Sequence, residues 1–555
     1  MPAPDPPIHS YFTAWDWAVV IGYLLLCTGV GHLLRGRQAS IRDFFLGGRS
    51  LPWPAVSGSI IATEISGVTF IGVPAMVFAA GGNFTYLQWA LGSIFARCVI
   101  GLYFVRYYYE KEIYSPYDFM GHRLGLGVKG LATVIFSIGS ILGQSVRVLV
   151  AALALNVVTP WSFETCIVVI GLFAILWTLI GGMRTVIWTD VMQFILFAIG
   201  GLCALFWIVG SVEGGWTTLW NLSTAGDGLA SLWTNANAPE VNKFFLIDTR
   251  FEANLGFTLW VAIFAIPFLN LSAFGVDQLN AQRMFCCRSA ADARKAIIAS
   301  SAGQFLTLLM LLVGAALFVY YRIHPPSPQA QALFDKTADN VFPTWITTTL
   351  PTGVRGLVLG GVFAAAISSL DSILAALSQT TLSLFCHPER RSGDGDNPRN
   401  LLLLSRGLVL LWGIFLTGFA ILLNSMRGAI NVVELAFGMV AYTTGPMLGM
   451  LLAAFWLRRC SVAGLVAGFI LSFLLVLFVR SDLHTILINS GVLSVQQAAE
   501  LGPFSVSQDG STLQSRIHFA WMYPITTLLT LACGAAGGLT FHRRTEKNPG
   551  DPGGH

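Results

Sequence analysis

The segment SGSIIATEISGVTFIGVPA, residues 57–75, decides how the rest of the sequence is interpreted. It lies inside an apolar run long enough to cross a bilayer, yet it carries the carboxylate of Glu64 together with Gly67, Gly72 and Pro74. A helix interrupted inside a membrane exposes backbone carbonyls and amides, which is tolerated only where they line a cavity or bind an ion. The segment therefore predicts a broken transmembrane helix that forms part of a binding site.

The composition indicates an integral membrane protein. Of the 555 residues, 55% are hydrophobic and 11% are charged, whereas roughly 25% of the residues in a soluble domain are charged. Apolar stretches that can span a hydrocarbon core of about 30 Å as helices recur along the chain. Because an open sheet cannot satisfy its backbone in lipid, we expect an all-helical bundle. About thirteen transmembrane helices are predicted, at residues 14–34, 52–79, 83–105, 126–158, 163–182, 186–211, 256–281, 294–321, 355–385, 401–424, 430–457, 462–480 and 518–541.

Basic residues are distributed unevenly between the connections. They follow the first, seventh, ninth and last predicted spans, whereas the connections 212–255 and 482–517 and the start of the chain are nearly free of them. Since lysine and arginine favour the cytoplasmic side, we expect an external N-terminus and a cytoplasmic C-terminus in the inner membrane of a cell. The first span lacks a basic leading segment and a small-residue cleavage site, so it is interpreted as a retained helix.

A second interrupted segment, FAIPFLNLSAFGVDQLNAQR at residues 264–283, lies five spans after the first. It contains Pro267, Gly275 and Asp277. Proline and glycine are common in transmembrane helices in general. Two interruptions at corresponding places in two halves, however, indicate an inverted-repeat transporter with a site near the bilayer midplane.

A third segment, GVFAAAISSLDSILAALSQTT, suggests an ion site. Its residues Ala365, Ser368, Ser369 and Ser372 follow helical spacing and share one narrow stripe. Hydroxyls and freed carbonyls are the oxygen ligands that sodium takes. The alternative is a small-residue face that only packs against a neighbouring helix.

Motifs of other function classes are missing from the sequence. It has no phosphate-binding loop, no HExxH and no metal-ligand spacing among its histidines, which argues against an ATP-driven pump or a membrane metalloprotease. We expect no enzyme activity, no catalytic residue and no cofactor other than sodium as a coupling ion. The net charge of +4 follows from the basic connections and does not indicate nucleic acid.

Four motifs carry a resemblance to a known family. GGMRTVIWTDVMQFILF at 181–197 resembles the signature of the sodium/solute symporter family, and three other segments are similar to its further landmarks in the same order, namely FIGVPA at 70–75, VDQLNAQR at 276–283 and SSLDS at 368–372. The resemblance implies the leucine-transporter fold, with ten core helices in a five-plus-five inverted repeat.

The resemblance also implies an organisation along the chain. One helix precedes the ten core helices and two follow them. The expected parts are an external N-terminus, first helix and cytoplasmic linker (1–51), core helices 1–5 (52–211), an external loop (212–255), core helices 6–10 (256–457), two additional helices (458–541) and a cytoplasmic tail (542–555).

A sodium site is implied residue by residue. In the family it uses backbone carbonyls of core helices 1 and 8 and two hydroxyls of core helix 8, which match Ala62, Ile65, Ala365, Ser368 and Ser369.

Some members hold a second sodium ion near a carboxylate that matches Asp190. The alternative for Asp190 is a solvated carboxylate near the start of a helix, where the helix dipole favours it. One or two sodium ions per cycle therefore remain open.

The substrate site departs from that of the family's sugar transporters. At five positions those members often present Asn, Gln, Glu, Asn and Lys, where this chain has Glu64, Thr69, Gln88, Asp277 and Gln304. Sugar specificity is therefore not implied.

Glu64 raises the question of charge balance. A carboxylate in the membrane costs at least ~2.5 kcal/mol unless it is paired or hydrated, and Arg147 is the first candidate partner, with Arg97 the second. If Glu64 and Arg147 pair, the nearly neutral cavity suits a sugar or another polyhydroxy solute, and a symporter of neutral sugars or amino acids is the alternative. If Arg147 is free, its planar guanidinium can clamp a carboxylate, and a carboxylate or sugar acid is slightly favoured.

The sequence predicts a sodium-coupled symporter that works by alternating access. We expect it to act as a monomer in the lipid bilayer, with sodium and a small solute as its partners. Two alternatives belong to other classes: a transporter-like membrane sensor, which would need a separate signalling partner because 542–555 is too short for a domain, and a passive channel, which would need no coupling ion.

Overall fold

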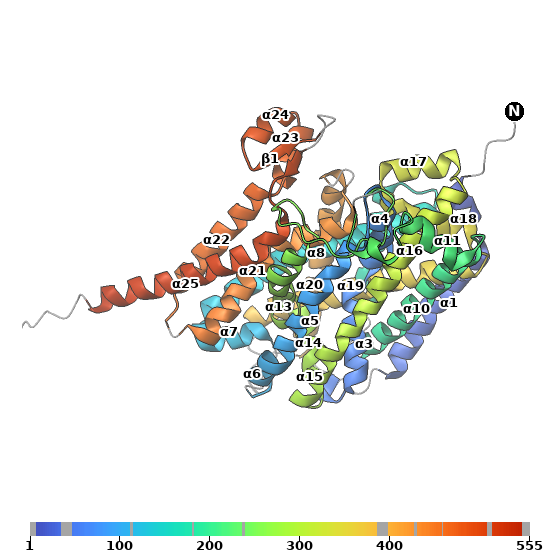
Figure 1. Cartoon of the computed structure of the whole chain (residues 1–555). Coiled ribbons are helices and arrows are strands. Elements are labelled where there is room, and N and C mark those ends of the chain that lie inside the picture. The colour runs from blue at the N-terminus through green and yellow to red at the C-terminus, as the bar shows by residue number, and fades with distance from the viewer. Residues whose placement is uncertain are drawn as a thin grey trace, which may run out of the picture.

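The computed structural model is a helical bundle that also contains a two-stranded antiparallel sheet (Figure 1). It describes residues 7–34, 47–110, 115–179, 183–235, 239–385, 398–426, 430–457, 459–507 and 513–546. Within these ranges, nine helices are long and apolar enough to cross a membrane, two bent helix pairs form further spans, and two shorter apolar helices accompany them. These elements coincide with the thirteen predicted segments.

The helices follow one another with short connections. Those up to residue 223 are α1 (Ala14–Leu34), α3 (Trp53–Glu64), α4 (Gly67–Phe78), α5 (Trp89–Val99), α6 (Val105–Glu110), α7 (Pro116–Leu124), α8 (Leu126–Val158), α9 (Phe163–Thr178), α10 (Met183–Gly210) and α11 (Gly215–Ser223). A π-helical turn, Ile100–Phe104, joins α5 to α6 within one span, and the 3₁₀ turn η3 (Phe84–Gln88) precedes α5.

The remaining elements form the second half and the C-terminal part. They are α12 (Leu259–Phe264), α13 (Ile266–Gly275), α14 (Gln278–Phe285), α15 (Ala290–Ala299), α16 (Gln304–Ile323), α17 (Pro328–Lys336), α18 (Val341–Thr349), α19 (Val354–Phe385), α20 (Pro398–Met426), α21 (Val432–Trp456), α22 (Val462–Val479), α23 (Asp482–Asn489), α24 (Val495–Glu500), β1 (Phe504–Val506), β2 (Leu513–Ser515) and α25 (Met522–Glu546).

The first predicted break is confirmed. The helices α3 and α4 are bent by 52°, and the Ser66 hydroxyl accepts a hydrogen bond from an amide in the first turn of α4 at 3.3 Å. The chain breaks just before Gly67, whereas Gly72 and Pro74 lie inside α4. Gly72 serves close packing instead, because an added Cβ would lie 2.6 Å from a methyl group of Val432 in α21.

The second predicted break is also confirmed. The pair α12–α13 meets α14 at 56°. Asp277 begins α14 by accepting a hydrogen bond from the Leu279 amide at 2.8 Å, and the Tyr108 hydroxyl of α6 donates to the Gly275 carbonyl at 2.6 Å. Backbone groups released by the break are thus bonded by their surroundings, as membrane interiors require.

The helices pack so that both breaks lie inside the bundle. The first broken helix contacts α10 and α16, and the second contacts α5 and α21, while α8 packs against α19, α20 and α21. α22 and α25 pack against α21 and against each other. In Figure 1, α17 lies at one end of the bundle together with the region of α23, α24 and the two-stranded sheet, and α6 and α15 lie at the opposite end.

Candidate functional site

A cavity of about 230 Å³ lies between the two broken helices. It is lined from α3, α4, α5, α8, α13, α14, α16 and α21, with an aromatic part that includes Tyr86, Trp89 and Phe437. Five of the six residues predicted from the sequence for the substrate site line it, namely Glu64, Thr69, Arg147, Asp277 and Gln304.

Glu64 is the last residue of α3 and pairs with Arg97 of α5, not with Arg147. Glu64 Oε2 accepts a short hydrogen bond from Arg97 Nη2, and Oε1 accepts one from Gln304 Nε2 at 3.3 Å. The Arg97 side chain is fully buried and that of Glu64 is 22% exposed. The first candidate partner is therefore wrong, and the second is confirmed.

Arg97 is held by more than Glu64. Its Nη1 donates to the Ser93 hydroxyl at 2.8 Å, and this hydroxyl donates in turn to Asn270 Oδ1 of α13 at 2.9 Å. The guanidinium carbon lies 4.3 Å from the centre of the Phe274 ring, a cation–π contact. This chain of contacts joins the end of α3 to the second broken helix. Ser93 and Asn270 were not predicted, because single hydroxyl and amide side chains in apolar spans give no pattern.

Arg147 lies in α8 and lines the same cavity. Among the described residues, its buried Nη1 has no hydrogen-bond partner, and neither has the buried Oε1 of Gln144 one turn earlier. Asp277 also lines the cavity and acts on Arg147 electrostatically, but no ion pair within 4 Å joins the two in the described part of the chain. Asp277 instead accepts a hydrogen bond in the first turn of α14, and Arg147 Nη1 remains without a hydrogen-bond partner among the described residues.

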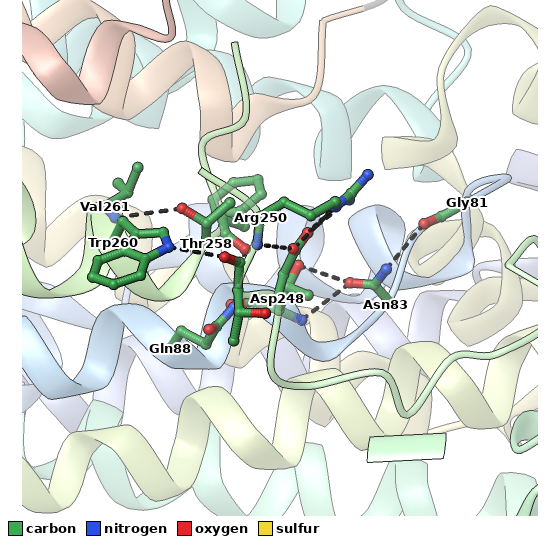
Figure 2. A network of polar contacts seen from close by, with 11 residues as sticks. Gly81, Asn83, Gln88, Asp248, Arg250, Thr258, Trp260 and Val261 are labelled. Atoms are coloured by element: carbon green, nitrogen blue, oxygen red, sulfur yellow. Dashed lines mark hydrogen bonds and ion pairs between the residues drawn. The ribbon is translucent and has the colours of Figure 1, made fainter. Parts of the chain in front are cut away.

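Gln88 lies outside the cavity lining, and the prediction that it helps form the substrate site is not supported. Its Nε2 donates to the Phe257 carbonyl at 3.0 Å and to the Thr85 carbonyl at 3.3 Å. Figure 2 shows it beneath the polar network of the loop before α12, where Arg250 forms an ion pair with Asp248 (Nη2–Oδ2 2.7 Å). The Gln88 amide therefore holds this loop against η3.

The predicted sodium donors are described only in part. Ala62 and Ile65 are buried at the end of α3, where the last carbonyls of a helix lack an amide of the same helix as a partner. Ser369 is buried on α19, which contacts α3 and α4. The side chains of Ala365 and Ser368 lie outside the described residues.

Asp190 is fully buried about two turns into α10. Its Oδ2 accepts hydrogen bonds from the Ser59 hydroxyl at 2.5 Å and from Arg283 Nη2 at 3.0 Å. The alternative of a solvated carboxylate at a helix start is therefore wrong. The sequence did not point to Arg283 as its partner, since the two residues are far apart along the chain.

Comparison with known proteins gives the family. The sequence model of the sodium:solute symporter family matches residues 44–472. The chain belongs to this family. It is 28% identical to the sodium/iodide cotransporter of Homo sapiens over 464 residues, which cover 82% of this chain and 68% of that protein. It is 26% identical to the sodium/sialic acid symporter SiaT of Proteus mirabilis (strain HI4320) over 472 residues, 84% of this chain and 90% of that one.

A further relative agrees with this assignment, and a solved structure gives the fold. The symporter is 26% identical to sodium-coupled monocarboxylate transporter 2 of Mus musculus over 476 residues, 83% of this chain and 72% of that one. The structure of a sodium-coupled sialic acid symporter in a substrate-bound outward-open state has a TM-score of 0.74 to it, at 23% identity, and covers 96% of this chain and 98% of its own. The leucine-transporter fold is thereby confirmed. The protein is a multi-pass membrane symporter coupled to sodium, and it is not an enzyme.

Proposed function

We propose that this symporter imports a small organic anion, a carboxylate or a sugar acid, together with sodium. The observation that carries the proposal is that one of two arginines near the cavity is paired with a carboxylate and the other, within the described residues, is not. Arg97 meets the charge of Glu64, while Arg147 lines the same cavity with a donor that has no partner among the described residues. A planar guanidinium binds a carboxylate through two parallel hydrogen bonds, and the arrival of an anion would offset the cost of a buried cation.

The chemistry of the relatives supports an anion. Iodide, monocarboxylate and sialic acid are the solutes in their names, and all three are anions or acids. A neutral sugar or an amino acid is the second candidate, because Asp277 shares the cavity with Arg147 and offsets part of its charge. In that case Asp277, and not the solute, would balance Arg147.

Sodium would bind beside the first break. The proposed ligands are the backbone carbonyls of Ala62, Ile65 and Ala365 and the hydroxyls of Ser368 and Ser369. The end of α3 inside the bundle supports this assignment, because it leaves carbonyls available next to α19. Neutral oxygen ligands suit a hard monovalent cation.

The basic residues support an orientation of the chain in the membrane. Basic residues such as Arg106, Arg288 and Arg294 flank the end of the bundle that carries α6 and α15 (Figure 1), which supports a cytoplasmic location for this end. The N-terminus and α17 would then be external and the C-terminus cytoplasmic. Residues 52–211 and 256–457 would be the two inverted repeats that alternate around the cavity, and a single chain would suffice.

Reconstitution into liposomes tests the proposal. Uptake of labelled monocarboxylates, sugar acids, neutral sugars and amino acids is measured with and without an inward sodium gradient. We expect acids to accumulate only with the gradient, Arg147→Gln to abolish their uptake, and Arg147→Lys to retain a weak part of it. Arg106→Gln, at an exposed arginine on α6, is the matched control and should transport normally.

Three results would contradict parts of this proposal. Uptake of a neutral solute by the wild type and by Arg147→Gln alike would support the second candidate. Equilibration without accumulation would indicate a channel, and binding without transport would indicate a sensor.

A further inference from the structure

Arg283 makes contacts with three other helices from its place in α14. Its side chain is 1% exposed. Nη2 donates to Asp190 Oδ2 at 3.0 Å and to the Ser372 hydroxyl at 2.9 Å, and Nε donates to the Ser59 hydroxyl at 2.9 Å. One guanidinium therefore joins α3, α10, α14 and α19, and α3 and α19 each pack against the other three helices.

Two of these partners lie next to the proposed sodium donors. Ser59 precedes Ala62 by three residues in α3, and Ser372 follows Ser369 by three residues in α19. Residues three apart share a helix face. The guanidinium thus connects the two helix faces that would supply ligands to the same ion, without itself offering a ligand, because arginine has only donors.

Asp190 anchors this guanidinium. Its carboxylate is fully buried and also accepts the Ser59 hydroxyl at 2.5 Å. A buried carboxylate needs a compensating charge, and Arg283 supplies it. The position of the guanidinium is thereby fixed relative to α10, a helix that contacts both α3 and α19.

Arg283 is also connected to the cavity. Its Nη1 donates to the Leu279 carbonyl at 2.5 Å, and Leu279 and Asp277 line the cavity from the first turn of α14. A solute that displaces this turn would also displace the guanidinium that spans the two sodium-donor helices.

We propose that Arg283 is a positioning residue of the sodium site, anchored by Asp190, and that it links the solute cavity to this site. It holds α3 and α19 at the separation at which both contact one ion, much as outer residues orient the ligands of other metal sites. Asp190 then serves as the anchor of Arg283 through Oδ2, while its buried Oδ1 has no hydrogen-bond partner among the described residues. The proposal rests on the sodium site given under the proposed function.

Sodium binding without solute provides the test, since the solute is not identified. The thermal midpoint of the purified protein in detergent is measured against sodium chloride, with choline chloride at equal ionic strength as the reference. Binding to the folded state raises the midpoint with the logarithm of the sodium concentration above the dissociation constant. The dissociation constant, which is the half-saturating sodium concentration, and the number of bound ions can therefore both be fitted.

Four variants of Arg283 and its hydrogen-bond partners test the positioning role. Arg283→Gln should raise the half-saturating sodium concentration about tenfold or more, and Arg283→Lys should recover part of this loss. Ser372→Ala removes one contact without changing charge and should give a smaller increase. If Arg283→Gln does not fold, Asp190→Asn combined with Arg283→Gln removes both buried charges and should fold while sodium binding stays weak. The matched control is Arg106→Gln.

The outcomes distinguish this proposal from the proposed function. If wild type shows no sodium-dependent midpoint, or Ser369→Ala leaves it unchanged, the sodium site itself is misassigned. If Ser369→Ala weakens sodium binding but the Arg283 variants and Ser372→Ala do not, only the positioning role is overturned. If the titration fits two bound sodium ions for the wild type and one for Asp190→Asn, with an unchanged half-saturating concentration for the remaining ion, Asp190 is a ligand of a second sodium ion and its role as an anchor is overturned.

Discussion

Glu64 and Arg97 offer the sharpest test of the cavity's charge balance. We expect Glu64→Gln to be strongly destabilising, because it leaves the fully buried guanidinium of Arg97 with only the Ser93 hydroxyl and the Phe274 ring. Arg97→Gln should be destabilising too, since it removes the cation from Glu64 and from the ring. In the double variant no uncompensated charge remains, so its loss of stability should be smaller than the sum of the two single losses.

The structure sets the size of the effect. Removing one partner of a buried ion pair costs about 3–5 kcal/mol. Glu64 is 22% exposed to the cavity, where water screens part of its charge, so we expect roughly 3 kcal/mol for Glu64→Gln. Arg97→Gln should cost a similar amount, to which the cation–π contact contributes about 1–2 kcal/mol. The double variant should then be about 2–3 kcal/mol more stable than the sum of the single effects predicts.

Equilibrium unfolding in mixed detergent micelles, followed for the wild type, both single variants and the double variant, measures this coupling. A second cycle with Glu64→Gln and Arg147→Gln is the control and should be additive within about 0.5 kcal/mol, as is usual for residues without a shared contact. Additive effects in the first cycle would refute the assignment of Arg97 as the charge partner. Strong coupling in the second cycle would instead identify Arg147 as the charge partner of Glu64.

Three further predictions concern other parts of the molecule. Ser369→Ala should raise the half-saturating sodium concentration about tenfold by removing one ligand, equivalent to roughly 1.4 kcal/mol; an unchanged sodium titration would exclude this hydroxyl. Uptake of an acid by Arg147→Lys should show a raised KM, because an ammonium cannot form the two parallel hydrogen bonds of a guanidinium, and a KM equal to that of wild type would count against the clamp. Burial lowers the pKa of Lys243, in the loop before α12, from 10.5 to about 8, although Glu240 opposes this. The folded chain then binds this proton less tightly than the unfolded chain, so stability should rise with pH between about 8 and 10.5, by up to about 3 kcal/mol; Lys243→Met should lack this rise, and an identical pH profile in both proteins would contradict the inference.

Much of the fold could be predicted because its signals are local. Apolar runs of membrane length give the spans, and the structure has a helix or a bent pair in each of them. The two breaks were also predicted, although their positions were not. The first follows Glu64 directly, while Pro74 lies within a continuous α4, because a proline in the interior of a helix packed on all sides need not end it when neighbours satisfy the backbone.

The candidate site was predicted less completely. Glu64 and Arg147 were recognised because a charged side chain in an apolar span is costly and therefore marks a functional position. Thr69, Asp277 and Gln304 were recognised because their positions match those compared with the family's sugar transporters. Gln88 is the exception: its position was matched to the family in the same way, but its amide is bound to the loop before α12. Nothing local to Gln88 distinguishes the two placements.

The sequence by itself determined that this protein is a helical membrane symporter with two interrupted helices, because hydrophobicity, helix breaks and family motifs are properties of contiguous segments. Only the tertiary structure decided which charges meet. Glu64 pairs with Arg97, 33 positions away, and Asp190 with Arg283, 93 positions away. Such pairs depend on which faces of different helices pack together, and several arginines in apolar spans satisfy the same sequence pattern. Packing chooses among them, because a buried charge is stable only beside the partner that the neighbouring helix places there.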